Sequence, residues 1–407
     1  MKKTNKKNKL VAILLICLII ILQSIQTFAA EELSINAKAG LIVETNTGKT
    51  IYEKEAEKQN YPASVTKILT AILVIENCKL DDVATASKTA ISNIPEGYVV
   101  APLYVGEEMK IEDLLYALML KSANDAAYVL AEHVGGSVEG FSDMMNKKAQ
   151  ELGCKNSHFV NPNGIHNENH YTTAYDMYLI SNYAMKNETF AKIVSTYKYT
   201  LPITNKYKSK DRVMENTNNF VNPNSKYYNE NVKGIKTGTT IQAGNCLITD
   251  VSKDGLSFIN VVLGANTSSG KFDETKKMID YEIDNYTLTQ VHKKGDKIQN
   301  IEVEKATNET KNLDLVISDD ITTMNNKKIT VDDMKPEIEL NEEIVAPITK
   351  GQELGTIKYN VEDIEYSAKL LAANDVERTY IVEIMIAVGI VFGIIFILII
   401  VKKIRRR

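Results

Sequence analysis

Ser64 and Lys67 are the residues in this sequence best suited to nucleophilic acyl transfer. That chemistry needs a nucleophile, a base beside it, and hydrogen-bond donors for the oxyanion that develops. The spacing S-x-x-K places a serine and a lysine one helical turn apart on one face, so the amine can reach the hydroxyl. The spacing alone is a weak signal, because it occurs three times in the sequence.

The surroundings of Ser64 favour it over the other two serines. Pro62 opens a predicted helix that continues through an almost wholly apolar run, 68–73, and must be buried. Ser64 then lies at a helix N-terminus, where backbone N–H groups favour developing negative charge. Burial lowers the pKa of Lys67, so a neutral amine can accept the serine proton. The other pairs are Ser195 with Lys198, in a predicted strand that points the two side chains apart, and Ser268 with Lys271, in a polar turn.

Two further segments carry residues that suit the same chemistry. Ser122 and Asn124 interrupt two predicted helices, and a spacing of two lets both side chains point into one cleft from an extended connection. Asn124 can also cap the helix that follows, and the two interpretations are compatible. In a predicted strand over 232–240, Lys236 and Gly238 share a face, so a cation stands beside a residue that lets a ligand backbone approach. A solvated edge strand is the alternative for this segment.

Histidine and cysteine chemistry has little support in this sequence. No G-x-S-x-G motif is present to suggest a serine–histidine hydrolase of that type. His166 and His170 have the i, i+4 spacing of metal ligands, but turn-forming residues precede them and the H-E-x-x-H order is missing. Cys78, Cys154 and Cys246 remain after the N-terminal segment, and their odd number and scatter indicate buried thiols. We therefore expect neither a metal nor another cofactor.

The elements that must position these residues indicate an α+β fold followed by a smaller β domain. Between residues 31 and 285, two predicted hairpins with turns at 46–48 and 254–255 supply an antiparallel sheet. Predicted helices accompany this sheet at 68–75, 111–120, 126–133 and 275–286. From 286 to 375, short alternating apolar runs separated by turns predict an all-β domain.

Both ends of the chain are hydrophobic, but in different ways. Residues 1–30 combine a basic start, a short apolar core and small residues, which predicts a cleaved secretory signal peptide; an uncleaved anchor is the alternative. Residues 380–401 are long and apolar enough to span a membrane, and the basic tail 402–407 follows them. We expect a single-pass protein of the cell membrane with its catalytic domain outside the cytoplasm.

The charge of the exported part argues against nucleic acid as a partner. The chain has 48 Lys and Arg against 52 Asp and Glu. Ten of the basic residues belong to the two ends, five in the first nine residues and five in the last six, which leaves 38 basic against 52 acidic. A protein that binds DNA or RNA needs a basic face, which this balance does not favour.

Together these motifs resemble those of the penicillin-binding serine acyl-enzymes. The motifs S-x-x-K, S-x-N and K-T-G occur here in that order, at 64–67, 122–124 and 236–238. The segments 61–67, 161–164 and 171–177, and the overall layout, make the sequence similar to the low-molecular-weight D-alanyl-D-alanine carboxypeptidases. The resemblance covers nearly the whole chain and implies a penicillin-binding or serine β-lactamase-like catalytic domain.

The resemblance also implies a role for each motif residue. Ser64 would attack the D-Ala–D-Ala carbonyl of peptidoglycan stem peptides, with Lys67 as its base and Ser122 as a third catalytic residue that relays protons. The implied substrate-binding residues are Asn124, Lys236, Thr237, Gly238 and Thr239. Lys236 and Thr237 would hold the terminal carboxylate, and the backbone N–H groups of Ser64 and Thr239 would form the oxyanion hole. β-Lactam antibiotics would acylate Ser64 because their ring amide mimics the scissile bond.

One departure from the family and three alternative functions stay open at this stage. Lys271 stands just before the last predicted helix of the catalytic domain, where relatives often carry arginine, so a point charge replaces a bidentate fork. A transpeptidase or a β-lactamase would use the same site. A non-catalytic wall-binding or sensor protein would use the β domain instead.

Overall fold

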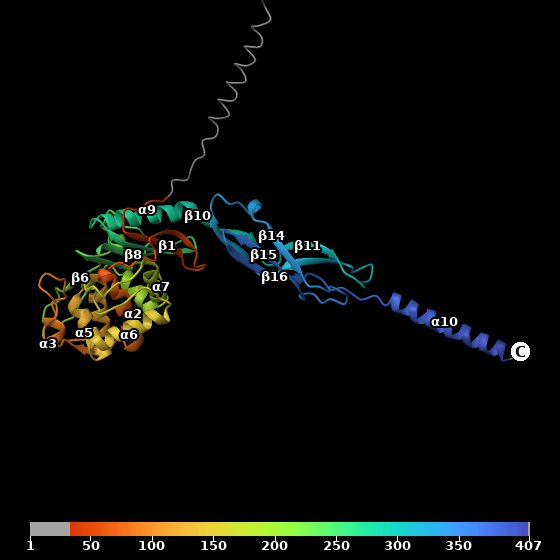
Figure 1. Ribbon diagram of the computed structural model, residues 1–407, viewed down its shortest axis with the longest axis horizontal. Helices are drawn as coiled ribbons and strands as arrows, with labels where there is room; N and C mark the ends of the chain where they lie inside the picture. The colour runs from red at the N-terminus through yellow and green to blue at the C-terminus, as the bar shows by residue number, and fades with distance from the viewer. Residues whose placement is uncertain (1–32, 406–407) are drawn as a thin grey trace, which may run out of the picture. The chain divides into compact units, whose positions relative to one another are not determined.

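The computed structural model describes residues 33–405 of the 407-residue chain. The predicted signal peptide over 1–30 and the last two residues of the basic tail lie outside this range. The described chain forms an α+β unit, a smaller all-β unit and a C-terminal helix (Figure 1).

An antiparallel five-stranded sheet is the centre of the α+β unit, with the strand order β2-β1-β9-β8-β7. Its strands are β1 (Ala39–Glu44), β2 (Thr50–Lys54), β7 (Lys236–Thr240), β8 (Gly244–Lys253) and β9 (Leu256–Ala265). Both predicted hairpins are present, and β1 of the first pairs with β9 of the second. Because β7 is an edge strand, one of its sides is free to pair with a ligand.

Helices cover both faces of this sheet (Figure 1). On one face α9 (Gly270–Asn285) packs Phe272 and Ile279 against the apolar side chains of β8. On the other face lie α2 (Lys67–Asn77), α5 (Asn124–Gly135), α6 (Val138–Glu151), α7 (Ala174–Met185) and α8 (Glu188–Ser195). The side chains of α2 are buried from Lys67 to Val74, as its apolar sequence predicts, so this helix is the centre of the helical layer.

Short elements complete this unit. They are α3 (Lys88–Ser92), α4 (Ile111–Tyr116), and the two-stranded ribbons of β3 (Val83–Thr85) with β4 (Glu108–Lys110) and of β5 (Lys198–Thr200) with β6 (Val213–Glu215). One irregular turn of π-helix, Ala117–Lys121, follows α4 and ends at Ser122.

The β unit contains a five-stranded sheet in the order β11-β12-β16-β15-β14 and the pair β10-β13. Its strands are β10 (Tyr286–His292), β11 (Lys297–Glu302), β12 (Asn312–Ile317), β13 (Ile321–Asn326), β14 (Pro336–Leu340), β15 (Glu353–Val361) and β16 (Ile364–Ala372). Apolar side chains of β12, β15 and β16 form its core. Within residues 33–405, α10 (Ile381–Ile404) is the one helix that is long and apolar enough to cross a membrane.

The structure corrects several predictions of local structure. Ser195 ends helix α8 and does not lie in a strand, because Asn187 caps the helix and its apolar residues repeat with helical period. The last helix of the α+β unit begins at Gly270, so Lys271 lies in its first turn and not before it. The strand predicted over 232–240 begins only at Lys236, since Gly234 has a φ of +135°.

The thiols are less uniform than predicted. Cys246 is buried, but Cys78 and Cys154 are only half-buried. All three are free thiols.

Candidate active site

A strained turn at the entrance to α2 presents Ser64. Residues Ala63–Thr66 form a single 3₁₀ turn that leads into the helix, and Ala63 has a left-handed φ of +48°. The Thr66 hydroxyl donates a hydrogen bond of 2.9 Å to the Ala63 carbonyl and so holds this conformation. Gly164 packs directly against it, since a Cβ on Gly164 would lie 1.8 Å from the Ala63 carbonyl oxygen. The turn therefore depends on a glycine about a hundred residues away in the sequence.

The Lys67 amine lies beside the Ser64 hydroxyl, at a distance of 3.0 Å from Nζ to Oγ. Lys67 is fully buried, and its Nζ also lies 3.0 Å from Asn124 Oδ1 and 2.7 Å from the Asn163 carbonyl oxygen. A neutral amine has two N–H groups and one lone pair. If the N–H groups donate to these two oxygens, the lone pair faces the Ser64 hydroxyl. The geometry therefore suits a base that accepts the proton of Ser64.

The electrostatics favour that neutral amine. Burial lowers the pKa of Lys67 well below its usual value, and the nearby charge of Lys236 lowers it further. Asp125 opposes this effect, because its carboxylate favours the charged amine. The carboxylate of Asp125 is itself occupied by the backbone N–H groups of Ala101, Leu103 and Ala126.

Asn124 joins the lysine to one wall of the cleft. Its Oδ1 accepts from Lys67, while its backbone N–H and its Nδ2 both donate to the Val99 carbonyl, each at 2.9 Å. Ser122 has a left-handed φ of +65° at the end of the π turn, two residues before Asn124. Ser122 and Asn124 line the same cleft, but they reach it through this left-handed turn and the first residue of α5, and not through the extended connection that was predicted.

Strand β7 forms the opposite side of the site. Gly238 lies against the nucleophile turn, because a Cβ there would be 2.9 Å from the Ser64 backbone nitrogen. Thr237 Oγ1 lies 2.6 Å from Thr217 Oγ1, and Thr239 Oγ1 lies 3.4 Å from Lys271 Nζ. The glycine predicted to make room for a ligand therefore makes room for the turn that carries Ser64.

The Lys236 amine is buried beneath β7 and donates to the Thr237 carbonyl at 3.0 Å. Burial, and then the charge of Lys271, lower the pKa of Lys236 to about 7. Burial likewise lowers the pKa of Lys271. Three buried amines therefore lie near the base of the site. An anionic group bound there would favour the charged forms of Lys236 and Lys271.

A cleft of about 720 Å³ opens above these groups. Of the predicted site residues, Ser64, Ser122, Asn124 and Thr239 line it. Lys67, Lys236 and Thr237 lie behind this surface, with at most 6% of each exposed. The predicted residues thus converge on one place, with four lining the cleft and three behind its surface.

Sequence reasoning missed His170 as part of this site. The Val160 N–H donates to its Nδ1, so Nε2 carries the proton and faces Thr66 Oγ1 at 2.9 Å. Burial, followed by the charges of His158, His166 and Lys67, lowers the pKa of His170 to about 3 and keeps the ring neutral. Both ring nitrogens therefore form hydrogen bonds to protein atoms. These bonds continue through Thr66 to the Ala63 carbonyl and so support the turn that carries Ser64. No local pattern in the sequence indicates this pairing.

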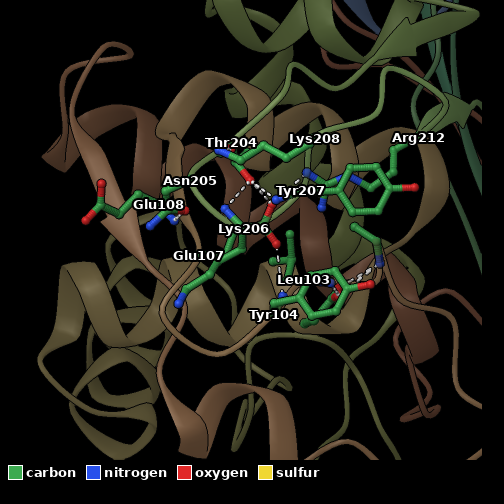
Figure 2. Close-up of polar contacts among 12 residues, drawn as sticks. Leu103, Tyr104, Glu107, Glu108, Thr204, Asn205, Lys206, Tyr207, Lys208 and Arg212 are labelled. Atoms are coloured by element: carbon green, nitrogen blue, oxygen red, sulfur yellow. Dashed lines mark hydrogen bonds and ion pairs between the residues drawn. The ribbon is translucent and has the colours of Figure 1, made fainter.

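A buried ion pair anchors the segment that follows the cleft wall (Figure 2). Arg212 lies 2.6 Å from Glu107, and the two side chains are 3% and 0% exposed. Glu107 also accepts hydrogen bonds from the Thr204 hydroxyl and the Tyr104 N–H. Burial alone would raise the pKa of Glu107, but these partners lower it below its ordinary value. The segment 104–107, which follows the cleft wall, is thereby tied to the connection between β5 and β6.

Comparison with known proteins places the chain in a family. A family model described as D-alanyl-D-alanine carboxypeptidase matches residues 26–267. A second model, described as penicillin-binding protein 5, C-terminal domain, matches residues 286–378. The chain therefore belongs to the D-alanyl-D-alanine carboxypeptidase family of serine hydrolases, as the motifs predicted. An acyl-enzyme mechanism and inhibition by β-lactams are general to this family.

Individual relatives support this assignment. The chain is 35% identical to D-alanyl-D-alanine carboxypeptidase DacF of Bacillus subtilis, over 80% of this chain and 82% of the relative. Penicillin binding protein 5 from Haemophilus influenzae superposes with a TM-score of 0.64 at 28% identity, covering 85% of this chain and 98% of that one. The Streptomyces K15 DD-transpeptidase superposes with a TM-score of 0.58 at 32% identity, covering 61% and 98%.

Proposed function

We propose that this protein removes the terminal D-alanine from peptidoglycan stem pentapeptides through an acyl-enzyme on Ser64. The observation that carries the proposal is the 3.0 Å contact between Ser64 Oγ and the fully buried amine of Lys67. A serine hydroxyl is a poor nucleophile by itself, and a neutral amine beside it supplies the missing base.

Acylation proceeds in two proton transfers. Lys67 takes the proton of Ser64 as the Ser64 oxygen attacks the carbonyl carbon of the penultimate D-alanine. The negative oxygen that forms accepts hydrogen bonds from the backbone N–H groups of Ser64 and Thr239. The proton then passes to the amine of the departing D-alanine, with Ser122 as the relay. The products are an ester on Ser64 and free D-alanine.

Hydrolysis of the ester reverses these roles. A water molecule gives its proton to Lys67 and attacks the ester carbonyl, and the proton then returns to the Ser64 oxygen as the peptide leaves. Asn124 keeps Lys67 in place throughout, because it also holds the cleft wall at Val99. The enzyme thus regains its neutral lysine at the end of each cycle.

The terminal carboxylate of the substrate binds at the start of β7. The Thr237 hydroxyl donates to it, while Lys236 and Lys271 supply positive charge from behind the strand. A carboxylate at this position favours the charged forms of both lysines, which burial otherwise disfavours. Substrate binding and lysine protonation are therefore coupled.

The chain acts at a membrane surface in this proposal. Residues 1–30 direct export and are removed, and residues 380–401 hold the protein in the membrane with the tail 402–407 in the cytoplasm. The catalytic domain, 31–285, and the β domain, 286–375, then lie outside, where peptidoglycan is. The exposed apolar surface of α10 supports this placement.

Penicillin labelling tests the site. We expect mass spectrometry to find one benzylpenicillin adduct, on Ser64, and none in Ser64→Ala. An adduct on another residue would overturn the assignment.

The reaction type needs a second measurement, with a stem pentapeptide and an amine acceptor. Free D-alanine with a shortened peptide indicates carboxypeptidase activity, a joined product indicates transpeptidation, and rapid penicillin turnover indicates a β-lactamase. A non-catalytic wall-binding protein would give no adduct at all.

A further inference from the structure

The mouth of the cleft has two apolar walls that the catalytic mechanism does not use. On one side the loop after α3 places Tyr98 and Val99 at the cleft, with 39% and 46% of each exposed. On the other side Ile241, which is 98% exposed, projects from the turn between β7 and β8. Exposing a branched apolar side chain this fully costs hydrophobic free energy unless a ligand covers it.

Hydrogen bonds support the backbone on both sides of the mouth. The Val99 carbonyl accepts two hydrogen bonds from Asn124, and the Tyr98 N–H donates to the Pro95 carbonyl. Opposite them, the Ala243 N–H donates to Thr240 Oγ1 and closes the turn that carries Ile241. The apolar side chains thus lie on loops whose backbone is hydrogen-bonded, which lowers the entropic cost of binding a ligand.

Charge changes sign between the base and the mouth of this cleft. The amines of Lys236 and Lys271 lie near the base, while Glu96 lines the mouth beside Tyr98. Within residues 33–405, no side chain forms an ion pair or hydrogen bond with the Glu96 carboxylate. The cleft therefore suits a ligand with a carboxylate at its inner end and a cation at its outer end.

The direction of the substrate places its third residue at this mouth. An extended peptide adds to the free edge of β7, with its carboxylate near Lys236 and its reacting carbonyl near Ser64 and Thr239. Residues further from the carboxylate then follow β7 toward Ile241, with a rise of about 3.3 Å each. The residue before the two D-alanines accordingly reaches Ile241 and Glu96.

We propose that Glu96 and Ile241 form a subsite for a polymethylene side chain that ends in an ammonium group, as in a stem peptide with L-lysine at its third position. Ile241 and Val99 cover the methylene groups, and Glu96 pairs with the ammonium. A second carboxylate beside that ammonium, as in meso-diaminopimelate, would face Glu96 and be repelled. The inference rests on the proposed function, because it takes the stem peptide as the substrate.

Three pentapeptides that differ only at the third residue test this subsite with the full-length protein in detergent. They carry L-lysine, Nε-acetyl-L-lysine or meso-diaminopimelate. We expect kcat/KM for D-alanine release to be about threefold to fivefold higher for L-lysine at low salt, the size expected of a partly exposed ion pair. The preference should shrink as ionic strength rises, because salt screens exposed charges.

Two variants separate the subsite from general effects of charge. Glu96→Gln should bring the three values of kcat/KM together, whereas Glu139→Gln, at an exposed site lining a different cavity, should leave the preference intact. Equal rates in the native protein, or a preference that survives in Glu96→Gln, would overturn the proposal. Ile241→Ser should lower kcat/KM for both lysine peptides relative to a peptide with L-alanine at that position.

Failure of the carboxypeptidase proposal can be distinguished from failure of the subsite proposal. If penicillin acylates Ser64 but no peptide loses D-alanine, the carboxypeptidase proposal fails. The subsite is still tested in that case, by the concentration of each peptide that slows penicillin labelling. The L-lysine peptide should protect at the lowest concentration, and equal protection by all three would overturn the subsite.

Discussion

At the residue scale, the proposed mechanism depends on Lys67 being neutral when Ser64 reacts. Complete burial and the nearby charge of Lys236 favour this state by lowering the pKa of Lys67. A cation at this position would have no lone pair to accept the serine proton. In the proposed mechanism, the charge state of this one buried side chain therefore controls the reaction.

Lys67→Arg tests that dependence. Arginine stays charged at every accessible pH, so we expect acylation by a fluorescent penicillin to slow by about 10²–10⁴-fold, the usual contribution of a general base. The second-order rate constant of labelling is the measurement, and the melting temperature is the control for folding. A rate within tenfold of the native one would contradict the role given to Lys67.

The pH dependence of peptide kcat/KM should have a rising limb, as Lys67 loses its proton, and a falling limb, as Lys236 loses its proton. Acylation rises as Lys67 loses its proton, and this limb lies well below pH 10.5 because burial lowers its pKa. Peptide kcat/KM then falls above a pH of about 7 as Lys236 loses the charge that attracts the carboxylate. Lys236→Arg keeps its charge, so the falling limb should disappear while the rising limb remains. Identical profiles for the two proteins would exclude Lys236 as the source of the fall.

At the element scale, the ion pair of Glu107 and Arg212 holds the segment that follows the cleft wall against the connection between β5 and β6 (Figure 2). Glu107→Gln leaves the Arg212 charge buried without a counter-charge. We expect a loss of about 3–5 kcal/mol in the free energy of unfolding, as for other broken buried pairs. Urea denaturation measures the loss. The exposed pair of Lys276 and Asp280 is the control, since Asp280→Asn should change stability little.

Helix α9 buries a carboxyl group against the sheet, and this makes stability depend on pH. Glu282 is fully buried and accepts from Asn260 Nδ2 at 3.2 Å. Burial raises its pKa well above the ordinary value, so the folded state holds a proton that the unfolded state releases. The contribution is fully present below the unfolded pKa of about 4.3 and is lost as pH rises through the raised folded pKa.

Glu282→Gln should remove that pH dependence. The amide cannot ionise, so we expect the variant to gain stability relative to the native protein as pH rises, and to match it most closely in acid. Melting temperatures across a pH series, with Asp284→Asn as an exchange on the same helix, give the comparison. A constant difference between Glu282→Gln and the native protein at all pH values would show that Glu282 does not titrate in this range.

At the scale of the whole molecule, the apolar helix α10 and the catalytic residues belong to separate elements. No contact in the site involves α10, whose residues are exposed along its described length. We therefore expect truncation after Thr379 to move the protein from the membrane fraction to the soluble fraction. The rate of penicillin labelling should stay unchanged. A truncated protein that remains in the membrane fraction would mean that another segment anchors it.

The sequence by itself determined the candidate nucleophile and base, and the main helices and strands. Ser64 and Lys67 could be paired because their spacing and the apolar run behind them are local properties of one helix. The hairpins of the sheet and the membrane-length helix followed from alternation and length in the same way. Boundaries were less predictable where backbone conformation decides them, as at Gly234 and at the first turn of α9.

Only the tertiary structure decided what each buried polar group contacts. The Asn163 carbonyl beside Lys67, the neutral ring of His170 beneath Thr66, and the ion pair of Glu107 all join segments far apart in the chain. The same holds for Glu96 and Ile241 across the mouth of the cleft. Periodicity shows which side of an element is buried, but the partner it meets depends on how distant loops pack together, and no local pattern records that.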